Sequence, residues 1–237
     1  TLVAPEWDFD FPGRDRLKDG YKALTARPFL PRYFPGFDLY LWIDGDCWVQ
    51  QGDAIALFLA AARTGALGAA PEIHRSMRHY HHAWGEFSAV CGAAYEACFD
   101  KSTAERLVRY PMINAGVFAL TSAAPHWQGW ATVLGEALQR STDMTDQMAL
   151  NVLVYDQGFA CEPLPSRCNW PVHHATPAWD AARGLFVEPA MPYDPLGILH
   201  LTIYTKRLAA IDVRELGGSH AGQVRPRSLR WPGRTAI

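Results

Sequence analysis

Two aspartates separated by one residue stand directly after an apolar stretch of the chain. The stretch covers residues 38–43, reads DLYLWI, and precedes Asp44, Gly45 and Asp46. Side chains alternate along an extended segment, so carboxylates at positions i and i+2 can point the same way, and the glycine lets a ligand approach the backbone. Hard divalent cations prefer oxygen ligands, often completed by substrate phosphates. The pattern favours a metal site over its alternative, a solvated turn, for which Asp-Gly is also common.

Four more phrases carry polar residues within apolar sequence. They are Asn114-Ala115-Gly116-Val117-Phe118; Asp146-Gln147 with Leu150-Asn151; Leu164-Pro165 with Asn169-Trp170; and His200 followed six residues later by Lys206. Together with the aspartate pair, and in this order, they resemble the motifs of the family-eight retaining glycosyltransferases, which have a GT-A fold and an Asp-x-Asp motif. The resemblance covers about residues 20–207.

The resemblance implies a metal site and a donor site. The metal ligands would be Asp44, Asp46 and His200, and the ion Mn²⁺ (or Mg²⁺) bridging the diphosphate of a nucleotide sugar. The donor-binding residues would be Lys22, Asp44, Asn114, Gly116 and Lys206, and the catalytic residues Asp146 and Gln147. Independent chemistry agrees with part of this set, because a divalent cation stabilises charge on a leaving diphosphate and a lysine adds a compact positive charge.

Each of these residues also has a purely structural interpretation. His200 lies among Ile198, Leu199 and Leu201 and could be a hydrogen-bonded core histidine. Asn114 could satisfy the backbone of a loop. Asp146, or Thr145 before it, could be the N-cap of a helix.

The sequence departs from the family pattern at two places. Ile203 stands where the terminal motif usually has glycine, and its side chain would lie near the diphosphate. Only 43 residues precede Asp44, and they contain no convincing opening strand. We therefore expect this chain to lack the N-terminal nucleotide-binding strands of the fold.

The elements that would position these residues follow from the apolar pattern. Short apolar runs predict strands at 38–43, 67–70, 115–120 and 197–201, the first of them buried on both faces of a parallel sheet. Helical spacing predicts helices at 54–62 (with Asp53 as N-cap), 86–99, 125–140 and 146–155. The expected fold class is α/β: one GT-A-like domain over residues 1–237, with a mixed central sheet, flanking helices and an irregular tail at 208–237.

A histidine-rich segment lies at residues 71–84 and is expected to be exposed. Its histidines are His74, His79, His81 and His82, with Tyr80 and Trp84 beside them. Arg75 and Arg78 are interleaved and would repel a cation, so an acceptor-side loop is favoured over a zinc site. An ordinary exposed loop remains the simplest interpretation.

Composition excludes several classes of protein. Of the 237 residues 49% are hydrophobic, and the net charge of −2 offers no field to attract nucleic acid. The five cysteines form no CxxC pair and are expected to be reduced thiols in a cytoplasmic protein. The arginines of the C-terminal end (Arg225, Arg227, Arg230 and Arg234, with Trp231) either belong to a solvated tail or contact anionic lipid at a membrane surface.

These observations give one favoured function and two alternatives. The favoured function is metal-dependent transfer of a hexosyl group, with retention, from a nucleotide sugar (a UDP-sugar) to a hydroxyl of a glycan, lipid-linked saccharide or protein. One alternative is a degenerate, non-catalytic sugar-binding domain. The other is a metal-dependent nucleotidyltransferase, which would need a glycine-rich and basic phosphate loop near its start.

Overall fold

A computed structural model of the protein describes residues 2–80 and 84–229. The apolar run after residue 38 forms strand β1, which pairs antiparallel with β4 along its whole length. β4 pairs antiparallel with β3, and β3 pairs parallel with β5, so the central sheet is mixed. The bounds are β1 (Leu39–Ile43), β4 (Ile113–Thr121), β3 (Leu67–Pro71) and β5 (Cys161–Pro163).

The prediction that the first strand lies in a parallel arrangement and is buried on both faces is wrong. In β1 only Tyr40 is fully buried, whereas β4 is buried from Ile113 to Leu120. A short apolar run predicts a buried strand, but it does not predict whether the neighbouring strand is parallel or antiparallel.

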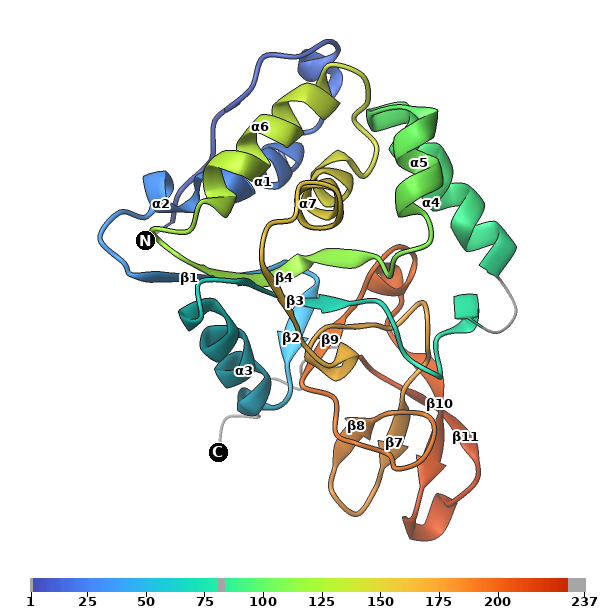
Figure 1. Ribbon diagram of the computed structural model, residues 1–237. Helices are drawn as coiled ribbons and strands as arrows, with labels where there is room; N and C mark the ends of the chain where they lie inside the picture. The colour runs from blue at the N-terminus through green and yellow to red at the C-terminus, as the bar shows by residue number, and fades with distance from the viewer. Residues whose placement is uncertain (1, 81–83, 230–237) are drawn as a thin grey trace.

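Helices cover both faces of this sheet, as Figure 1 shows. On one face α6, α7 and α1 pack over the strands, and on the other lies α3. The residues of β4 divide between the two sides: Phe118 and Leu120 belong to the larger core with Trp130, whereas Val117 and Ala119 belong to the smaller core under α3. The bounds are α1 (Tyr21–Ala26), α2 (Leu30–Tyr33), α3 (Gly52–Arg63), α6 (His126–Leu138) and α7 (Thr145–Tyr155).

The predicted helices exist, but their first residues differ from the predictions. Asp53 does not cap α3; it lies in the first turn, and its carboxylate is 3.0 Å from Arg167 Nη1. The N-cap residue of α7 is Met144, so Asp146 is not the cap either. The predicted helix at 86–99 is α4 (Trp84–Cys98), and α5 (Lys101–Leu107) follows it after the N-cap Asp100, which accepts a hydrogen bond from Thr103 N at 2.7 Å.

Two smaller sheets complete the described part of the chain. One has the order β2 (Cys47–Val49), β9 (Ile198–His200) and β6 (Trp170–Pro171). The other has the order β11 (Val224–Arg227), β10 (Ile211–Leu216), β7 (Ala178–Asp180) and β8 (Leu185–Val187). They share a third core that includes Trp170, Phe186, Leu199 and Val213. The protein is thus an α/β protein with mixed sheets and flanking helices.

The predicted irregular tail at 208–237 is wrong for residues 211–227. These residues form the antiparallel hairpin β10–β11, in which Val213 and Glu215 are buried and alternate with exposed Asp212 and Arg214. This alternation is the period-two signal of a strand. Residues 230–237 lie outside the described part of the chain.

Two further findings bear on the sequence-based expectations. All five cysteines are free thiols. Among the described residues, no helix has both the length and the apolar character needed to cross a membrane.

Candidate functional site

The Asp44–Asp46 turn is fixed by the backbone of two neighbouring strands. Asp44 N donates to Gly116 O of β4 at 2.8 Å, and Leu201 N donates to Asp46 O at 2.9 Å. Within the turn, Cys47 N donates to Asp44 O at 3.0 Å. The turn is therefore built into the junction of the central sheet and the β2–β9–β6 sheet, unlike a loose, solvated connection.

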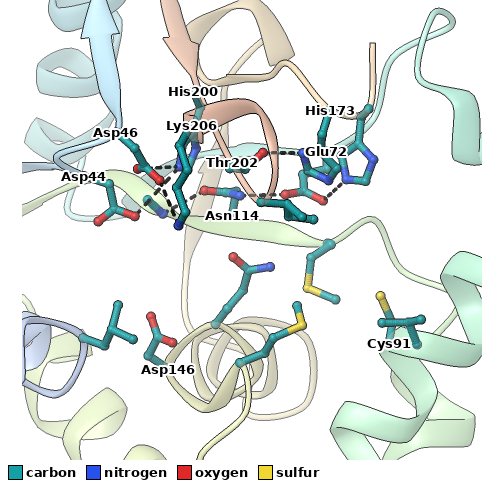
Figure 2. A pocket seen from close by; sticks show the side chains of 18 of the residues that line it. Asp44, Asp46, Glu72, Cys91, Asn114, Asp146, His173, His200, Thr202 and Lys206 are labelled. Atoms are coloured by element: carbon teal, nitrogen blue, oxygen red, sulfur yellow. Dashed lines mark hydrogen bonds and ion pairs between the residues drawn. The ribbon is translucent and has the colours of Figure 1, made fainter. Parts of the chain in front are cut away.

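Four charged or ionisable side chains meet above this turn, as Figure 2 shows. His200 Nε2 lies 3.3 Å from Asp46 Oδ1 and 3.9 Å from Asp44 Oδ2. Lys206 Nζ lies 3.5 Å from Asp46 Oδ2. His200 enters from β9, and Lys206 from the 3₁₀ turn Thr205–Arg207. The structure thus brings together the residues for which the sequence predicted metal and diphosphate binding.

A chain of side-chain amides runs from Glu72, at the end of β3, to His200. Asn114 Nδ2 donates to Glu72 Oε1 at 2.6 Å, and Asn114 Oδ1 accepts from Asn169 Nδ2 at 3.0 Å and from Gly116 N at 2.8 Å. Asn169 Oδ1 then faces His200 Nδ1 at 3.0 Å. A carboxylate is an acceptor only, so Glu72 fixes the orientation of both amides.

Glu72 is ionised, and its charge sets which end of each amide in this row donates and which accepts. Burial opposes its charge, but hydrogen bonds from His174 and Asn114 outweigh burial and lower the pKa of Glu72 to about 2. With both amides oriented, Asn169 Oδ1 is the acceptor for a proton on His200 Nδ1. Nε2, which faces Asp46 Oδ1 at 3.3 Å, is then the nitrogen that could bind a cation shared with that carboxylate.

The ligand atoms at this turn suit a divalent cation. Asp46 and His200 offer one oxygen and one nitrogen at close range, and Asp44 Oδ2 is the next nearest carboxylate oxygen. In the described residues the tightest cluster of possible ligand atoms joins Asp46, His200 and Cys47, within 4.8 Å of one another. Cys47, however, packs against the core under α3, and burial raises the pKa of its thiol. A protonated thiol is a poor ligand for a hard cation, so Asp44, Asp46 and His200 remain the better set.

Arg27 is a site residue that the sequence analysis missed, as are Glu72, His173 and His174, which also line the cavity described below. Arg27 is buried, and its guanidinium bridges the carboxylates of Asp146 and Asp44. It also lies over the ring of Trp42 at 5.3 Å, and Trp42 Nε1 donates to Asp44 Oδ1 at 2.6 Å. Burial alone would lower the pKa of Arg27, but the two carboxylates raise it, so the guanidinium stays charged. Nothing in the local sequence around Arg27 marks it, because its partners lie 17 and 119 positions away.

Lys22 does not reach the site. Its ammonium pairs with Asp19 at 3.1 Å and lies over the ring of Trp7 at 5.6 Å, and it does not line the cavity described below. The assignment of Lys22 to donor binding is therefore not supported; on this side of the site the buried cation is Arg27.

Gly116 and Gln147 shape the floor of the site. A Cβ atom at position 116 would lie 2.9 Å from both Asn114 Oδ1 and Asp44 Oδ2, and nearer still to the ring of His200. Only glycine therefore lets β4 pass this close to Asp44 and His200. Gln147 Oε1 accepts a hydrogen bond from Ala115 N at 3.2 Å, in the stretch where the register between β3 and β4 shifts.

These side chains surround a cavity of about 350 Å³. Its wall includes every predicted site residue except Lys22, namely Asp44, Asp46, Asn114, Gly116, Asp146, Gln147, His200 and Lys206. Asp146 lies across the cavity from Lys206 (Figure 2). Burial raises the pKa of its carboxyl group, and the charge of Arg27 opposes that effect.

The expectation of an exposed histidine-rich loop is wrong for its central part. His79 is buried; its Nδ1 lies 3.2 Å from His174 Nδ1, and its ring stacks on Phe87 at 4.2 Å. His74 pairs with buried Glu188 at 3.2 Å. His79 supports the cavity wall through Phe87 and His174, which both line the cavity. Neither His74 nor His79 belongs to a cluster of possible metal ligands among the described residues. His81 and His82 lie outside the described residues, as does the side chain of Tyr80.

The arginines near the C-terminus are only partly tail-like. Arg225 is exposed, but Arg227 Nε lies 2.8 Å from buried Glu215 and its guanidinium lies 4.4 Å above the ring of Trp179. Arg227 therefore holds the β10–β11 hairpin to β7. Arg230, Trp231 and Arg234 lie outside the described residues.

Comparison of the chain with models of known protein families and with curated protein sequences gives no match.

Proposed function

We propose that this protein is a metal-dependent glycosyltransferase with a GT-A-like fold. It would transfer a hexosyl group from a nucleotide sugar, a UDP-sugar, to a hydroxyl acceptor with retention of configuration. One observation carries the proposal: residues from four distant parts of the chain line a single cavity. They are Asp44 and Asp46 after β1, Asn114 and Gly116 on β4, Asp146 and Gln147 on α7, and His200 and Lys206 at and after β9.

The charges of the cavity suit a diphosphate leaving group. A Mn²⁺ or Mg²⁺ ion held by Asp44, Asp46 and His200 would act as a Lewis acid for the departing diphosphate. Lys206, which pairs with Asp46, adds a positive charge beside the same oxygens. Arg27 keeps Asp44 in place and offsets its charge, so the ligand carboxylate is held in one orientation.

The opposite wall suits the sugar. Positive charge develops on the sugar ring as the bond to the diphosphate breaks, and oxygen acceptors nearby stabilise it. Asp146 lies on that wall, with Arg27 positioning its carboxylate. The Gln147 carbonyl oxygen already accepts from Ala115 N, so Asp146 is the stronger candidate for contact with the transferring sugar.

The proposal is tested by release of UDP from a panel of UDP-hexoses in the presence of Mn²⁺. We expect metal-dependent hydrolysis or transfer with at least one donor. Lys206→Ala should reduce kcat/KM by about 10²-fold or more, as removal of a charge-stabilising group does in other enzymes. Lys22→Ala is the matched control, because Lys22 lies outside the cavity, and it should retain activity.

Two outcomes would contradict this function. Equal activity in the two lysine variants would remove Lys206 from the diphosphate site. Tight, metal-dependent binding of UDP-hexoses without turnover of any of them would favour a sugar-binding domain.

A further inference from the structure

The cavity has two chemically different ends. Asp44, Asp46 and Lys206 gather at one end, and Cys91 of α4 marks the other (Figure 2). The wall at and beyond this second end is apolar and is built by three segments: α4, the residue before β4, and the N-cap of α7. Its members are Phe87, Val90, Cys91, Met112 and Met144.

This apolar wall is held in place from behind. Phe87 stacks on the buried ring of His79 and meets His174 edge-on, with ring centroids 5.5 Å apart. Burial and the nearby charge of Glu72 raise the pKa of Cys91 to about 12, so its thiol stays protonated and behaves as a small apolar group. Met112 is fully buried. The wall is a preformed surface for a nonpolar group.

The polar groups between the two ends are already paired with one another. Glu72 accepts from Asn114 with one oxygen and faces His174 Nε2 with the other, at 3.1 Å. His173 Nδ1 pairs with the hydroxyl of Thr202. Because these side chains already have hydrogen-bond partners, a nonpolar group can lie beside them without depriving them of one.

The mouth of the cavity carries two exposed aliphatic side chains. Val90 is 60% exposed and Ile203 is 61% exposed, and both line the cavity. Ile203 also has a φ of 52°, a left-handed conformation that β-branched residues rarely adopt. Such strain persists where the surrounding structure imposes it, and often at functional sites. Here it holds an apolar side chain at the rim, at the position where the family pattern has glycine.

We propose that the cavity binds an amphiphilic hydroxy compound. Its hydroxyl or sugar head points toward the Asp46–Lys206 end, beside the place proposed for the metal and the diphosphate. Its aliphatic chain lies along the apolar wall and leaves past Val90 and Ile203. The role of this compound as the sugar acceptor rests on the proposed glycosyl transfer. Its binding rests only on the shape and chemistry of the cavity.

The test uses n-alkyl β-glucosides with chains of four to eight carbons, below the concentration at which they form micelles. Calorimetric titration into the whole protein is carried out without nucleotide and without metal. Each methylene placed on an apolar wall strengthens binding by about 3- to 4-fold. We expect affinity to rise in this way along the series. An affinity that does not depend on chain length would overturn the proposal.

Substitutions at the rim locate the binding. Val90→Asp places a charge on the path of the chain and should weaken binding of the octyl glucoside by 10-fold or more. Val224→Asp is the matched control: Val224 is 65% exposed on β11, away from the cavity, and its replacement should change nothing. Ile203→Asn keeps a residue that tolerates positive φ while removing the apolar group, and should weaken binding by about 5-fold.

The outcomes separate this inference from the proposed function. If Val90→Asp and Val224→Asp bind the octyl glucoside equally, the amphiphile site is wrong even where UDP binds with Mn²⁺. If UDP fails to bind while chain-length dependence and the Val90 effect hold, the glycosyltransferase proposal falls and an amphiphile-binding cavity remains.

Discussion

At the scale of single residues, the orientation of His200 is the decisive feature of the site. His200 can act as a metal ligand only if its Nε2 carries a lone pair, so the position of the imidazole proton matters. Glu72 orients Asn114 and Asn169 so that Asn169 Oδ1 accepts from His200 Nδ1, which leaves Nε2 as the nitrogen that would bind the proposed ion. The site thus depends on hydrogen bonds behind the ligands as well as on the ligands.

Replacing Asn169 tests this chain of hydrogen bonds. In Asn169→Leu the Nδ1 proton of His200 loses its acceptor, and we expect the imidazole to move to the Nε2–H form, which donates to Asp46. Binding of Mn²⁺ must then displace that proton, and affinity should fall by about 10- to 100-fold. Two-bond ¹⁵N–¹H NMR spectra report the tautomer, and calorimetry reports the affinity.

A control accompanies this variant, because Asn169 is buried. Urea unfolding must first show that Asn169→Leu is folded at the temperature of the titration. If the folded variant keeps both the Nδ1–H tautomer and the affinity of the parent protein, Asn169 does not position His200.

At the scale of elements, the segment before α4 is partly buried although its composition predicts exposure. Arg75 and Arg78 are exposed and His74 is half-buried, as polar sequence predicts. His79, however, is enclosed by Glu72, His174 and Phe87. Sequence patterns report average solvent preference, and they miss a histidine whose buried partners lie in other elements.

This burial predicts a pH dependence of stability. Burial, then the proximity of His174, lowers the pKa of His79 to about 4. In the unfolded chain the histidine titrates near pH 6.5, so between pH 6.5 and 4 the unfolded state binds the proton more tightly and stability falls as pH falls. His79 should contribute about 2 kcal/mol to the loss of unfolding free energy between pH 7 and pH 5.

Urea unfolding at pH 7 and pH 5 measures this contribution. His79→Gln should reduce the difference in unfolding free energy between the two pH values, although His173, whose pKa is lowered to about 3 by burial and by His174, keeps part of it. His220→Gln, in the turn between β10 and β11, is the control and should leave the difference unchanged. An unchanged difference in His79→Gln would contradict the buried, neutral state of His79.

At the scale of the whole molecule, the cavity lies where the central sheet, the β2–β9–β6 sheet and helices α4 and α7 meet. Asp44, Asp46, His200 and Lys206 are named together by the resemblance of five phrases in order to a family pattern, and all four line the cavity. His200 taken alone favours a core histidine. The sequence could not predict Arg27, whose role exists only once the segment after α1 packs against α7 and β1. Lys22, five positions earlier, is the basic residue that the resemblance implies for donor binding; it pairs with Asp19 and does not line the cavity.

The architecture shows the same division between local and long-range information. Helical spacing predicted α6 and α7, because the apolar residues of a helix recur every three to four positions within one continuous segment. The antiparallel pairing of β1 with β4 and the parallel pairing of β10 with β7 join segments that lie far apart in the sequence. Local periodicity does not specify such pairings.

The central claim is that Asp44, Asp46, His200 and Lys206 form a site for a divalent cation and a nucleoside diphosphate. Calorimetric titration of UDP into the protein, with and without Mn²⁺, tests it most directly, with Asp46→Asn as the matched variant. The account predicts that UDP binds with Mn²⁺, that affinity falls by at least 10-fold without the metal, and that Asp46→Asn loses the metal dependence. UDP binding that is absent with Mn²⁺, or that is equal with and without it, would contradict the account.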